Sequence, residues 1–340
     1  MTIRKIIFSR PGEVTFAALE VDLAPTSPME IVIQNHFSLV SAGTELACLS
    51  GGEPWFPLPG TPGYGAVGRV LETGSGVTKV HAGDMVFTHG PHAERFKFDS
   101  TDRYTGTCVR LPEGINPEHA LFARMVTIAM CAIRVSHIEL GDRVLVTGLG
   151  QIGNFAAQLA QLQGGRVIGA DINPRRRLLA QTCGIEHTLD SQAANWQMEL
   201  GTAIGGEKIS TVIEASGLSS VATQVVPLVA PHGEIVLLGT PRQSFQCDVT
   251  ELFRHIHLPG FIEFRGALEW RYPTFRQEFS KHSIERNSEI ALDLIRTGRI
   301  RVSPLCTHKI RPEGAADAYA HLKSDGENYV GVIFDWASDS

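Results

Sequence analysis

Two hydrophobic patterns follow one another along the chain. Up to about residue 112, short apolar runs alternate with polar residues and end at glycine or proline, which is typical of β-strands. The strand signals cover residues 3–8, 30–35, 65–73, 84–87 and 94–98. Many short strands at regular spacing predict a small β-barrel or sandwich.

Residues 54–65 interrupt this first pattern. They are too rich in proline and glycine to form a helix or a strand, so we expect a loop that edges a cleft. Trp55 and Phe56 in this loop are candidates to shape a pocket. Packing of the loop against the core is the alternative role for such aromatic residues.

The period changes after residue 112. A largely apolar helix is expected over residues 117–135, and strand and helix signals then alternate. The strand signals lie at residues 143–146, 166–170, 210–214, 234–238 and 261–267. Repeated strand–helix units build a parallel sheet that is covered on both faces. The predicted fold class is therefore α/β, with a doubly wound parallel sheet beside the β-barrel.

The last part of the chain mixes both patterns. Helices are expected at residues 288–296 and 314–322, and strands at 306–310 and 329–334. The final strand is easiest to place in the sheet of the first domain, which makes that domain discontinuous. The expected segments are 1–115 for the first domain, 116–271 for the second, and 272–340 for the return to the first.

The strand at residues 143–146 runs into a G-x-G-x-x-G motif, Gly148-Leu149-Gly150-Gln151-Ile152-Gly153, and a helical stretch follows. Gly148 permits a tight turn, Gly150 lets the backbone approach a pyrophosphate, and Gly153 allows the helix to pack on the strand. The helix N-terminus then faces the anionic phosphates. A turn without a ligand is the alternative, and the combination of strand, helix and a following acid favours a dinucleotide.

That acid is Asp171, at the end of the next predicted strand. A carboxylate there accepts hydrogen bonds from both ribose hydroxyls and repels a 2′-phosphate, which favours NAD over NADP. The counter-signal is Arg175-Arg176-Arg177, which has the charge to clamp a 2′-phosphate. Stacking of Arg176 over the adenine is the competing use, and a solvated helix face is the expected role of Arg175 and Arg177.

Five stretches together resemble the medium-chain dehydrogenase/reductase superfamily over nearly the whole chain. They are Gly43-Thr44-Glu45, residues 62–70, residues 76–86, the Gly148–Gly153 motif with Asp171, and Glu214-Ala215-Ser216-Gly217. Residues 41–45 and 91–94 look most like the branch with bacteriochlorophyllide-type dehydrogenases and bacterial polyol dehydrogenases. The resemblance implies that segments 1–115 and 272–340 form a GroES-like substrate domain, that 116–271 form a Rossmann domain, and that the protein is a homodimer.

The chain departs from the family where zinc-dependent members bind their catalytic metal. The position of the cysteine before G-T-D holds Ala42, and the histidine and glutamate of the G-H-E motif are replaced by Tyr64 and Gly65. A further ligand position aligns with Arg124. Zinc requires thiolate, imidazole or carboxylate ligands, and the four-cysteine structural lobe is also missing, so we expect neither a catalytic nor a structural zinc.

Without a metal, an alcohol dehydrogenase needs hydrogen-bond donors and a general acid or base. The cluster Thr88-His89-Gly90-Pro91-His92 follows a predicted strand, and histidine has a pKa near working pH. We expect His92 to be the acid/base or to orient the substrate, with His89 as second choice; a loop histidine bonded to backbone is the alternative for both. Thr44 is a candidate proton relay or turn cap, and Tyr64 either fills the metal's space or acts as a phenolic acid.

The predicted function is a zinc-independent, NAD(H)-linked oxidoreductase that moves hydride between nicotinamide and a secondary alcohol or ketone, such as a sugar or polyol. Two alternatives stay open, an NADPH-dependent quinone or enoyl reductase and a dinucleotide-binding protein without turnover. We expect cofactor contacts at Gly148, Gly150, Gln151, Ile152, Gly153, Asp171, Arg176, Ser216 and Gly239.

Composition narrows the choice of partners and compartment. A chain of 340 residues has room for two domains, and a net charge of -6 without a basic face argues against a nucleic-acid partner. The six cysteines are scattered, which indicates reduced thiols. With no signal peptide pattern and no run of about 18 apolar residues, we expect a cytoplasmic protein that binds a small-molecule substrate and no membrane.

Overall fold

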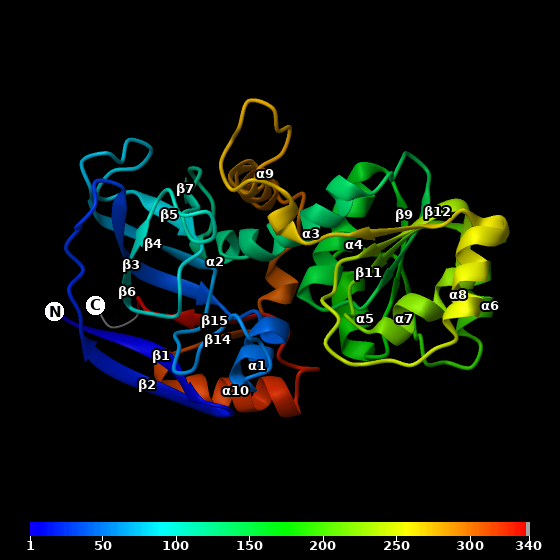
Figure 1. The fold of residues 1–340 in the computed structure, drawn as a ribbon, viewed down its shortest axis with the longest axis horizontal. Coiled ribbons are helices and arrows are strands. Elements are labelled where there is room, and N and C mark those ends of the chain that lie inside the picture. The colour runs from blue at the N-terminus through cyan, green and yellow to red at the C-terminus, as the bar shows by residue number, and fades with distance from the viewer. Residues whose placement is uncertain (338–340) are drawn as a thin grey trace. The chain divides into compact units, whose positions relative to one another are not determined.

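The polypeptide divides into two units, and each is described here by itself (Figure 1). One unit comprises Met1–Arg124 and Tyr272–Ser340, and the other comprises Met125–Arg271. The structure, a computed structural model, describes residues 1–337. The first boundary falls at Arg124 instead of residue 115, and the second falls between Arg271 and Tyr272.

The first unit contains a two-stranded sheet and a seven-stranded sheet. In the larger sheet the order is β14-β15-β3-β4-β5-β7, with β6 paired to β3. Its strands and those of the small sheet are β1 (Thr2–Arg10), β2 (Glu13–Glu20), β3 (Glu30–Leu39), β4 (Ala66–Thr73), β5 (Met85–Thr88), β6 (Arg95–Asp99), β7 (Cys108–Arg110), β14 (His308–Ile310) and β15 (Val332–Asp335).

The return of the C-terminus to the first sheet is confirmed. Strand β15 pairs antiparallel with β3, with Ile333 opposite Leu39 and Asp335 opposite Phe37. The helices of this unit are α1 (Ala42–Leu49), α2 (Pro117–Ala120), α9 (Ile284–Arg296) and α10 (Ala315–Ser324). A buried cluster joins β1, α1, α10 and β15, and Phe8, Cys48, Tyr319 and Phe334 are among its members.

Three elements of the first unit were not predicted. Strand β2 pairs with β1 across the Pro11-Gly12 turn, but it lacks a buried face, so its sequence carries a weak alternation. Strand β7 has only three residues. Helix α1 begins directly after Ser41 and includes Gly43 and Thr44.

The second unit is a six-stranded parallel sheet in the order β10-β9-β8-β11-β12-β13, and helices lie on both of its faces (Figure 1). The central strands are buried almost throughout because both faces are covered. The strands are β8 (Arg143–Thr147), β9 (Arg166–Ala170), β10 (His187–Leu189), β11 (Ile209–Glu214), β12 (Val229–Leu237) and β13 (Glu263–Gly266). This is the doubly wound architecture that the alternating pattern predicted.

The helices of the second unit are α4 (Gln151–Gln163), α5 (Pro174–Thr182), α6 (Trp196–Ala203), α7 (Ser219–Gln224) and α8 (Val249–His255), while α3 (Ala123–Val135) starts in the first unit. Short 3-10 turns span Val226–Leu228, Glu269–Arg271, Ser303–Leu305 and Pro312–Gly314, and a π-helical turn spans Ile256–Gly260. Within residues 1–337, none of the helices combines the length and apolar character needed to cross a membrane.

Candidate active site

The G-x-G-x-x-G motif forms the turn between β8 and α4. Gly148 has a φ of +84°, and a Cβ there would lie 2.7 Å from the backbone nitrogen of Ser216. A Cβ at Gly153 would lie 1.7 Å from the carbonyl oxygen of Gly148, so helix and turn are in direct contact. A Cβ at Gly150 would meet nothing within 4 Å. The turn therefore leaves room at Gly150, where a pyrophosphate would approach the backbone.

The strand order places this turn at the position where ligands bind in doubly wound sheets. Strands β8 and β11 are neighbours in the sheet. From β8 the chain continues to β9 on one side, and from β11 it continues to β12 on the opposite side, so the direction of strand addition reverses between β8 and β11. Ligands bind at this reversal, outside the carboxyl ends of the strands. Gln151 and Ile152 form the first turn of α4, so their backbone N–H groups lie at the positive end of the helix.

Asp171 lies directly after β9 and is 4% exposed. One carboxylate oxygen accepts a hydrogen bond from the Leu149 N–H at 2.7 Å, and the other accepts one from the Asn173 N–H at 2.8 Å. The side chain therefore links the glycine-rich turn to the loop that starts α5. This is the position from which a carboxylate reaches an adenosine ribose.

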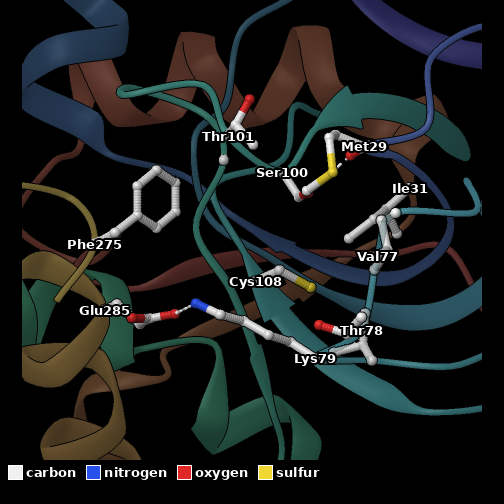
Figure 2. A pocket seen from close by; sticks show the side chains of 13 residues that line it. Met29, Ile31, Val77, Thr78, Lys79, Ser100, Thr101, Cys108, Phe275 and Glu285 are labelled. Carbon is white, nitrogen blue, oxygen red and sulfur yellow. Dashed lines mark hydrogen bonds and ion pairs between the residues drawn. The ribbon is translucent and has the colours of Figure 1, made fainter.

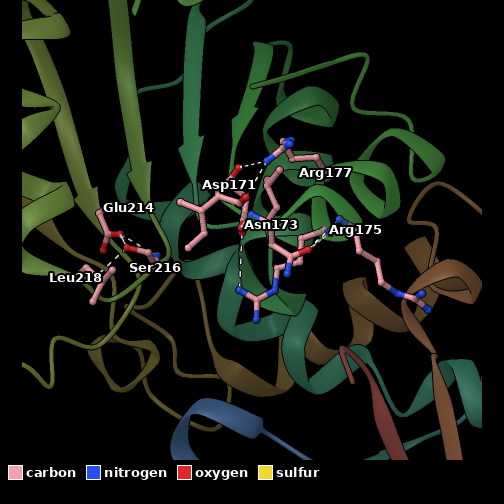
Figure 3. A network of polar contacts seen from close by, with 10 residues as sticks. Asp171, Asn173, Arg175, Arg177, Glu214, Ser216 and Leu218 are labelled. Carbon is pink, nitrogen blue, oxygen red and sulfur yellow. Dashed lines mark hydrogen bonds and ion pairs between the residues drawn. The ribbon is translucent and has the colours of Figure 1, made fainter. Parts of the chain in front are cut away.

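The three arginines beside Asp171 have different surroundings. Arg177 donates to the carbonyl oxygens of Asp171 and Ile172 (Figure 3). It also pairs with Asp190 at 3.3 Å. It therefore stabilises the loop and is not the solvated side chain that we expected. Arg176 lies 3.9 Å from the Asp171 carboxylate, and Arg175 is exposed.

On the other side of the turn, Ser216 and Gly239 gather around Glu214, the last residue of β11. Ser216 donates to the Glu214 carboxylate from its hydroxyl and from its N–H, the latter at 2.8 Å (Figure 3). Gly239 donates its N–H to the Glu214 carbonyl oxygen at 2.8 Å. Burial raises the pKa of Glu214, and the hydrogen bonds from Ser216 and Gly217 oppose that shift. The fold thus brings together all the residues predicted to bind a cofactor in this unit.

In the first unit, His92 is fully buried inside a hydrogen-bond network. Its Nε2 lies 3.1 Å from a Glu45 carboxylate oxygen, and its Nδ1 lies 2.7 Å from Ser38 Oγ. The same Glu45 oxygen accepts a hydrogen bond from the Tyr319 hydroxyl, and Ser38 Oγ accepts one from Trp336 Nε1 at 2.9 Å. The network ties β3, α1 and the loop after β5 to the C-terminal segment.

This network occupies both ring nitrogens of His92. The carboxylate of Glu45 only accepts, so Nε2 donates to it, and Nδ1 is hydrogen-bonded with Ser38 Oγ. Both ring nitrogens are therefore occupied, and no ring atom is exposed. The acid/base role expected for His92 does not fit this geometry, and the histidine holds Glu45 in position instead. Ser38, Tyr319 and Trp336 were not foreseen from the sequence.

Tyr64 and Thr44 lie together at the start of α1. The Tyr64 hydroxyl donates to Ser41 Oγ, and Thr44 also hydrogen-bonds with the phenol. Burial raises the pKa of Tyr64, while the charge of Arg124 and the two hydroxyls partly offset the rise. The phenol therefore stays protonated at neutral pH. Three hydroxyl groups thus form one short row.

Arg124 lies against this row. Its Nε donates to the Tyr64 carbonyl oxygen at 3.0 Å, and its guanidinium carbon is 4.8 Å from the centre of the Tyr64 ring. A Cβ at Gly65 would lie only 3.1 Å from Arg124 Cγ, so glycine makes room for the arginine stem. The side chain is 3% exposed. A buried guanidinium thus stands beside Tyr64 and Gly65.

His89 is also buried, but only half of its hydrogen-bonding capacity is used. Nδ1 lies 3.2 Å from the Tyr104 carbonyl oxygen, while Nε2 is buried and has no hydrogen-bond partner in the described part of the chain. Burial holds the pKa of His89 well below its ordinary value, and the charge of Arg124 adds to this shift. The ring is therefore neutral at ordinary pH.

A cavity of about 240 Å³ in the first unit is separate from these residues (Figure 2). Lys79 and Glu285 are the charged residues of its lining, and they form an ion pair with each other. Cys108 also faces the cavity, and burial raises the pKa of its thiol to about 12. The pairing neutralises the two charges and the thiol stays protonated, so this cavity does not compete as a catalytic site.

Two family models match the chain. One, described as an alcohol dehydrogenase GroES-like domain, matches residues 27–129, and one described as a zinc-binding dehydrogenase matches residues 152–280. D-guloside 3-dehydrogenase of Shigella flexneri is 30% identical over 274 residues, which cover 79% of this chain and 76% of that protein. The chain belongs to the medium-chain dehydrogenase/reductase superfamily. The resemblance and the α/β fold class with a GroES-like domain are thereby confirmed.

Other relatives agree with this assignment. L-Galactonate-5-dehydrogenase of Escherichia coli is 23% identical over 362 residues, covering 98% of this chain and 99% of that protein. The crystal structure of galactitol-1-phosphate dehydrogenase from Escherichia coli has a TM-score of 0.82 at 20% identity, covering 98% of this chain and 99% of the other. This medium-chain dehydrogenase is thus an oxidoreductase of the alcohol and polyol dehydrogenase type, which depends on a pyridine nucleotide and acts on small molecules.

The residues at the family's catalytic metal position do not fit a zinc ion. Ala42, Tyr64, Gly65 and Arg124 provide no thiolate, imidazole or carboxylate, and the contacts of Arg124 with Tyr64 and Gly65 support its alignment with the fourth position. Across residues 1–337, no group of three or more His, Cys, Asp or Glu side chains is arranged to hold a metal ion. The description of the family as zinc-binding therefore does not match the side chains of this chain.

Proposed function

We propose that this protein is a zinc-independent, NAD(H)-linked dehydrogenase that interconverts a secondary alcohol and a ketone on a sugar or polyol derivative. When bound, the nicotinamide supplies or accepts the hydride. The observation that carries the proposal is the buried guanidinium of Arg124, which lies against Tyr64 and Gly65 where zinc-dependent relatives place metal ligands. A fixed cation there repels a metal dication and supplies positive charge to a substrate oxygen.

Asp171 supports NAD as the cofactor. Its carboxylate is held in place by two backbone N–H groups, so a 2′-phosphate would meet a fixed negative charge. Arg177, which would otherwise favour NADP, is bonded to two carbonyl oxygens and to Asp190. The remaining positive charge near the ribose comes from Arg176, whose expected role is to stack on the adenine.

The relatives support a polyhydroxylated substrate. By their names, D-guloside 3-dehydrogenase and L-galactonate-5-dehydrogenase act on sugar derivatives. The hydroxyl row of Ser41, Thr44 and Tyr64 offers the hydrogen bonds that such a substrate needs. Thr44, Tyr64 and His89 are the candidate proton carriers.

Metal analysis and a substrate screen test the proposal together. The purified enzyme should contain less than about 0.1 zinc per chain and should reduce NAD with at least one member of a panel of sugars, sugar acids, polyols and aromatic alcohols. EDTA should leave that activity unchanged. Stoichiometric zinc, or loss of activity on chelation, would show that the metal-free mechanism is wrong.

Fluorescence titration separates this function from its alternatives. NADH should bind more tightly than NADPH; tighter binding of NADPH would favour a quinone or enoyl reductase. Binding of NADH without turnover of any alcohol would favour a dinucleotide-binding protein.

We also propose a homodimer that forms through strand β13. It is an edge strand of the six-stranded sheet, and Phe261, Phe264 and Leu268 around it are 58%, 39% and 63% exposed. An apolar edge of this kind favours pairing with a second chain. Sedimentation should give a dimer, and Phe264→Glu should shift it toward the monomer. A wild-type monomer at micromolar concentration would contradict this assembly.

A further inference from the structure

The unpartnered atom of His89 points to a ligand. The Tyr104 carbonyl oxygen only accepts hydrogen bonds, so the proton of the neutral His89 ring lies on Nδ1 and Nε2 carries a lone pair. Nε2 is buried, in a side chain that is 5% exposed, without a hydrogen bond to the described residues. An unsatisfied buried acceptor destabilises the fold, and a catalytic role is one reason for an enzyme to keep such a group.

Arg124 supplies positive charge close by. Its stem packs on Gly65, and the next residue in the chain, Ala66, pairs with Thr88, which precedes His89. Arg124 Nε donates to the Tyr64 carbonyl oxygen, and the guanidinium charge acts on both His89 and Tyr64. A guanidinium donates through several N–H groups and accepts none, whereas His89 Nε2 accepts and does not donate. One hydroxyl group can donate its proton to His89 Nε2 while its oxygen faces the guanidinium charge.

We propose that His89 and Arg124 hold the reacting hydroxyl of the substrate, with His89 Nε2 as the proton acceptor and Arg124 as the charge that stabilises the oxygen. This assignment rests on the proposed dehydrogenase function. In alcohol oxidation, the hydroxyl proton would pass to His89 Nε2. The carbon that bears this hydroxyl would lose a hydride, with the electron pair of its C–H bond, and nicotinamide would supply the hydride acceptor when bound. The C–O bond would become a carbonyl, and the imidazolium would later release its proton to water.

Electrostatics around His89 agree with this role. The neighbouring guanidinium favours an alkoxide-like oxygen, and it disfavours an imidazolium once the product is neutral. The proton is therefore accepted while the oxygen carries negative charge and released when that charge is gone. His92 cannot take this role, because Ser38 and Glu45 occupy its nitrogens. The Tyr64 phenol donates to Ser41.

His89→Asn is the sharpest test, because the asparagine amide can still donate to the Tyr104 carbonyl while the Nε2 acceptor is removed. With the fastest substrate of the panel, kcat should fall about 10²–10⁴-fold, and the Kd of NADH should change less than about twofold. His81→Asn is the matched control, since His81 is exposed in the same unit. A His89→Asn enzyme within about threefold of wild-type kcat would overturn the assignment.

Two further variants keep the test decisive if His89→Asn folds poorly. In His89→Ala, added imidazole should restore activity, and restoration should rise with the concentration of neutral imidazole. Arg124→Met should lower kcat about 10²–10³-fold, and Arg124→Lys should recover part of it. A large loss in Tyr64→Phe, with no loss in either His89 variant, would assign the proton to the hydroxyl row and refute the proposal.

Nitrogen-15 NMR tests the geometry without any substrate. The ring of His89 should show a protonated Nδ1 and an unprotonated Nε2 at pH 7, and a protonated Nε2 would overturn the argument. The two levels of failure are distinguishable. An inactive or zinc-dependent wild type refutes the proposed function, whereas a metal-free active enzyme with an intact His89→Asn rate refutes only this inference.

Discussion

Glu45→Gln should destabilise the first unit more than it impairs chemistry. The Glu45 carboxylate accepts hydrogen bonds from His92, from Tyr319 and from the Ser41 N–H at 2.8 Å, and it is 2% exposed. A glutamine offers a single acceptor oxygen. When that oxygen faces His92 and Tyr319, the amide NH2 faces the Ser41 N–H, and two donors oppose each other.

Glu45→Gln should lower the free energy of unfolding by about 2–4 kcal/mol, because one buried donor loses its acceptor and two hydrogen bonds lose their charged acceptor. At about 2–4 °C per kcal/mol for a unit of this size, the melting temperature should fall by about 4–16 °C. Tyr319→Phe removes one donor and should cost only about 1 kcal/mol. Glu113→Gln, at an exposed position, is the matched control.

Hydrogen exchange followed by mass spectrometry is the appropriate assay, because the two units need not unfold together. Peptides that contain residues 38–49 and 319–336 should exchange faster in Glu45→Gln, while peptides of β8 and β9 serve as an internal reference. Unchanged protection together with a hundredfold loss of kcat would refute the reasoning. In that case the Glu45–His92 pair would carry protons instead of holding the fold.

Three further predictions concern the cofactor turn and the response to pH. Gly153→Ala should abolish NADH binding and unfold the turn, because its Cβ would lie 1.7 Å from the Gly148 oxygen. Gly150→Ala, where the space is open, should leave the fold intact and weaken NADH binding at least tenfold. Circular dichroism measures the fold of each variant, and fluorescence titration measures its affinity for NADH. Asp171→Asn should narrow the preference for NADH over NADPH by about tenfold, about 1.4 kcal/mol, in the same titration, and an unchanged preference would exclude Asp171 as its source. Since the pKa of His89 is depressed in the folded protein, the unfolded state binds the extra proton. The contribution of His89 to the free energy of unfolding should therefore be constant above about pH 6.5 and fall below it by up to about 1.4 kcal/mol per pH unit. Urea unfolding of His89→Asn should lack that additional slope.

Local sequence was sufficient to predict the turn between β8 and α4 and the parallel sheet of the second unit. The strand, the turn and the helix around Gly148–Gly153 are contiguous. Gly148 and Gly153 are required by close backbone contacts within or beside the motif, while Gly150 leaves open space. The alternating periods predicted the parallel sheet for a similar reason, because a strand that is buried on both faces must be apolar along its whole length. The replacement of the usual metal ligands at Ala42, Tyr64 and Gly65 was also visible in the sequence.

Only the tertiary structure distinguished the surroundings of the two histidines. Both occur in one short loop with similar neighbours, yet His92 bonds to Ser38 and Glu45, 54 and 47 positions away, and Glu45 bonds to Tyr319, 274 positions away. His89 keeps an Nε2 that has no hydrogen-bond partner among residues 1–337. Hydrogen-bond satisfaction depends on residues brought together by folding, whereas glycine turns and strand periods depend on neighbours in the chain. That difference is the reason why the glycine-rich turn was predictable from the sequence and the hydrogen bonding of the two histidines was not.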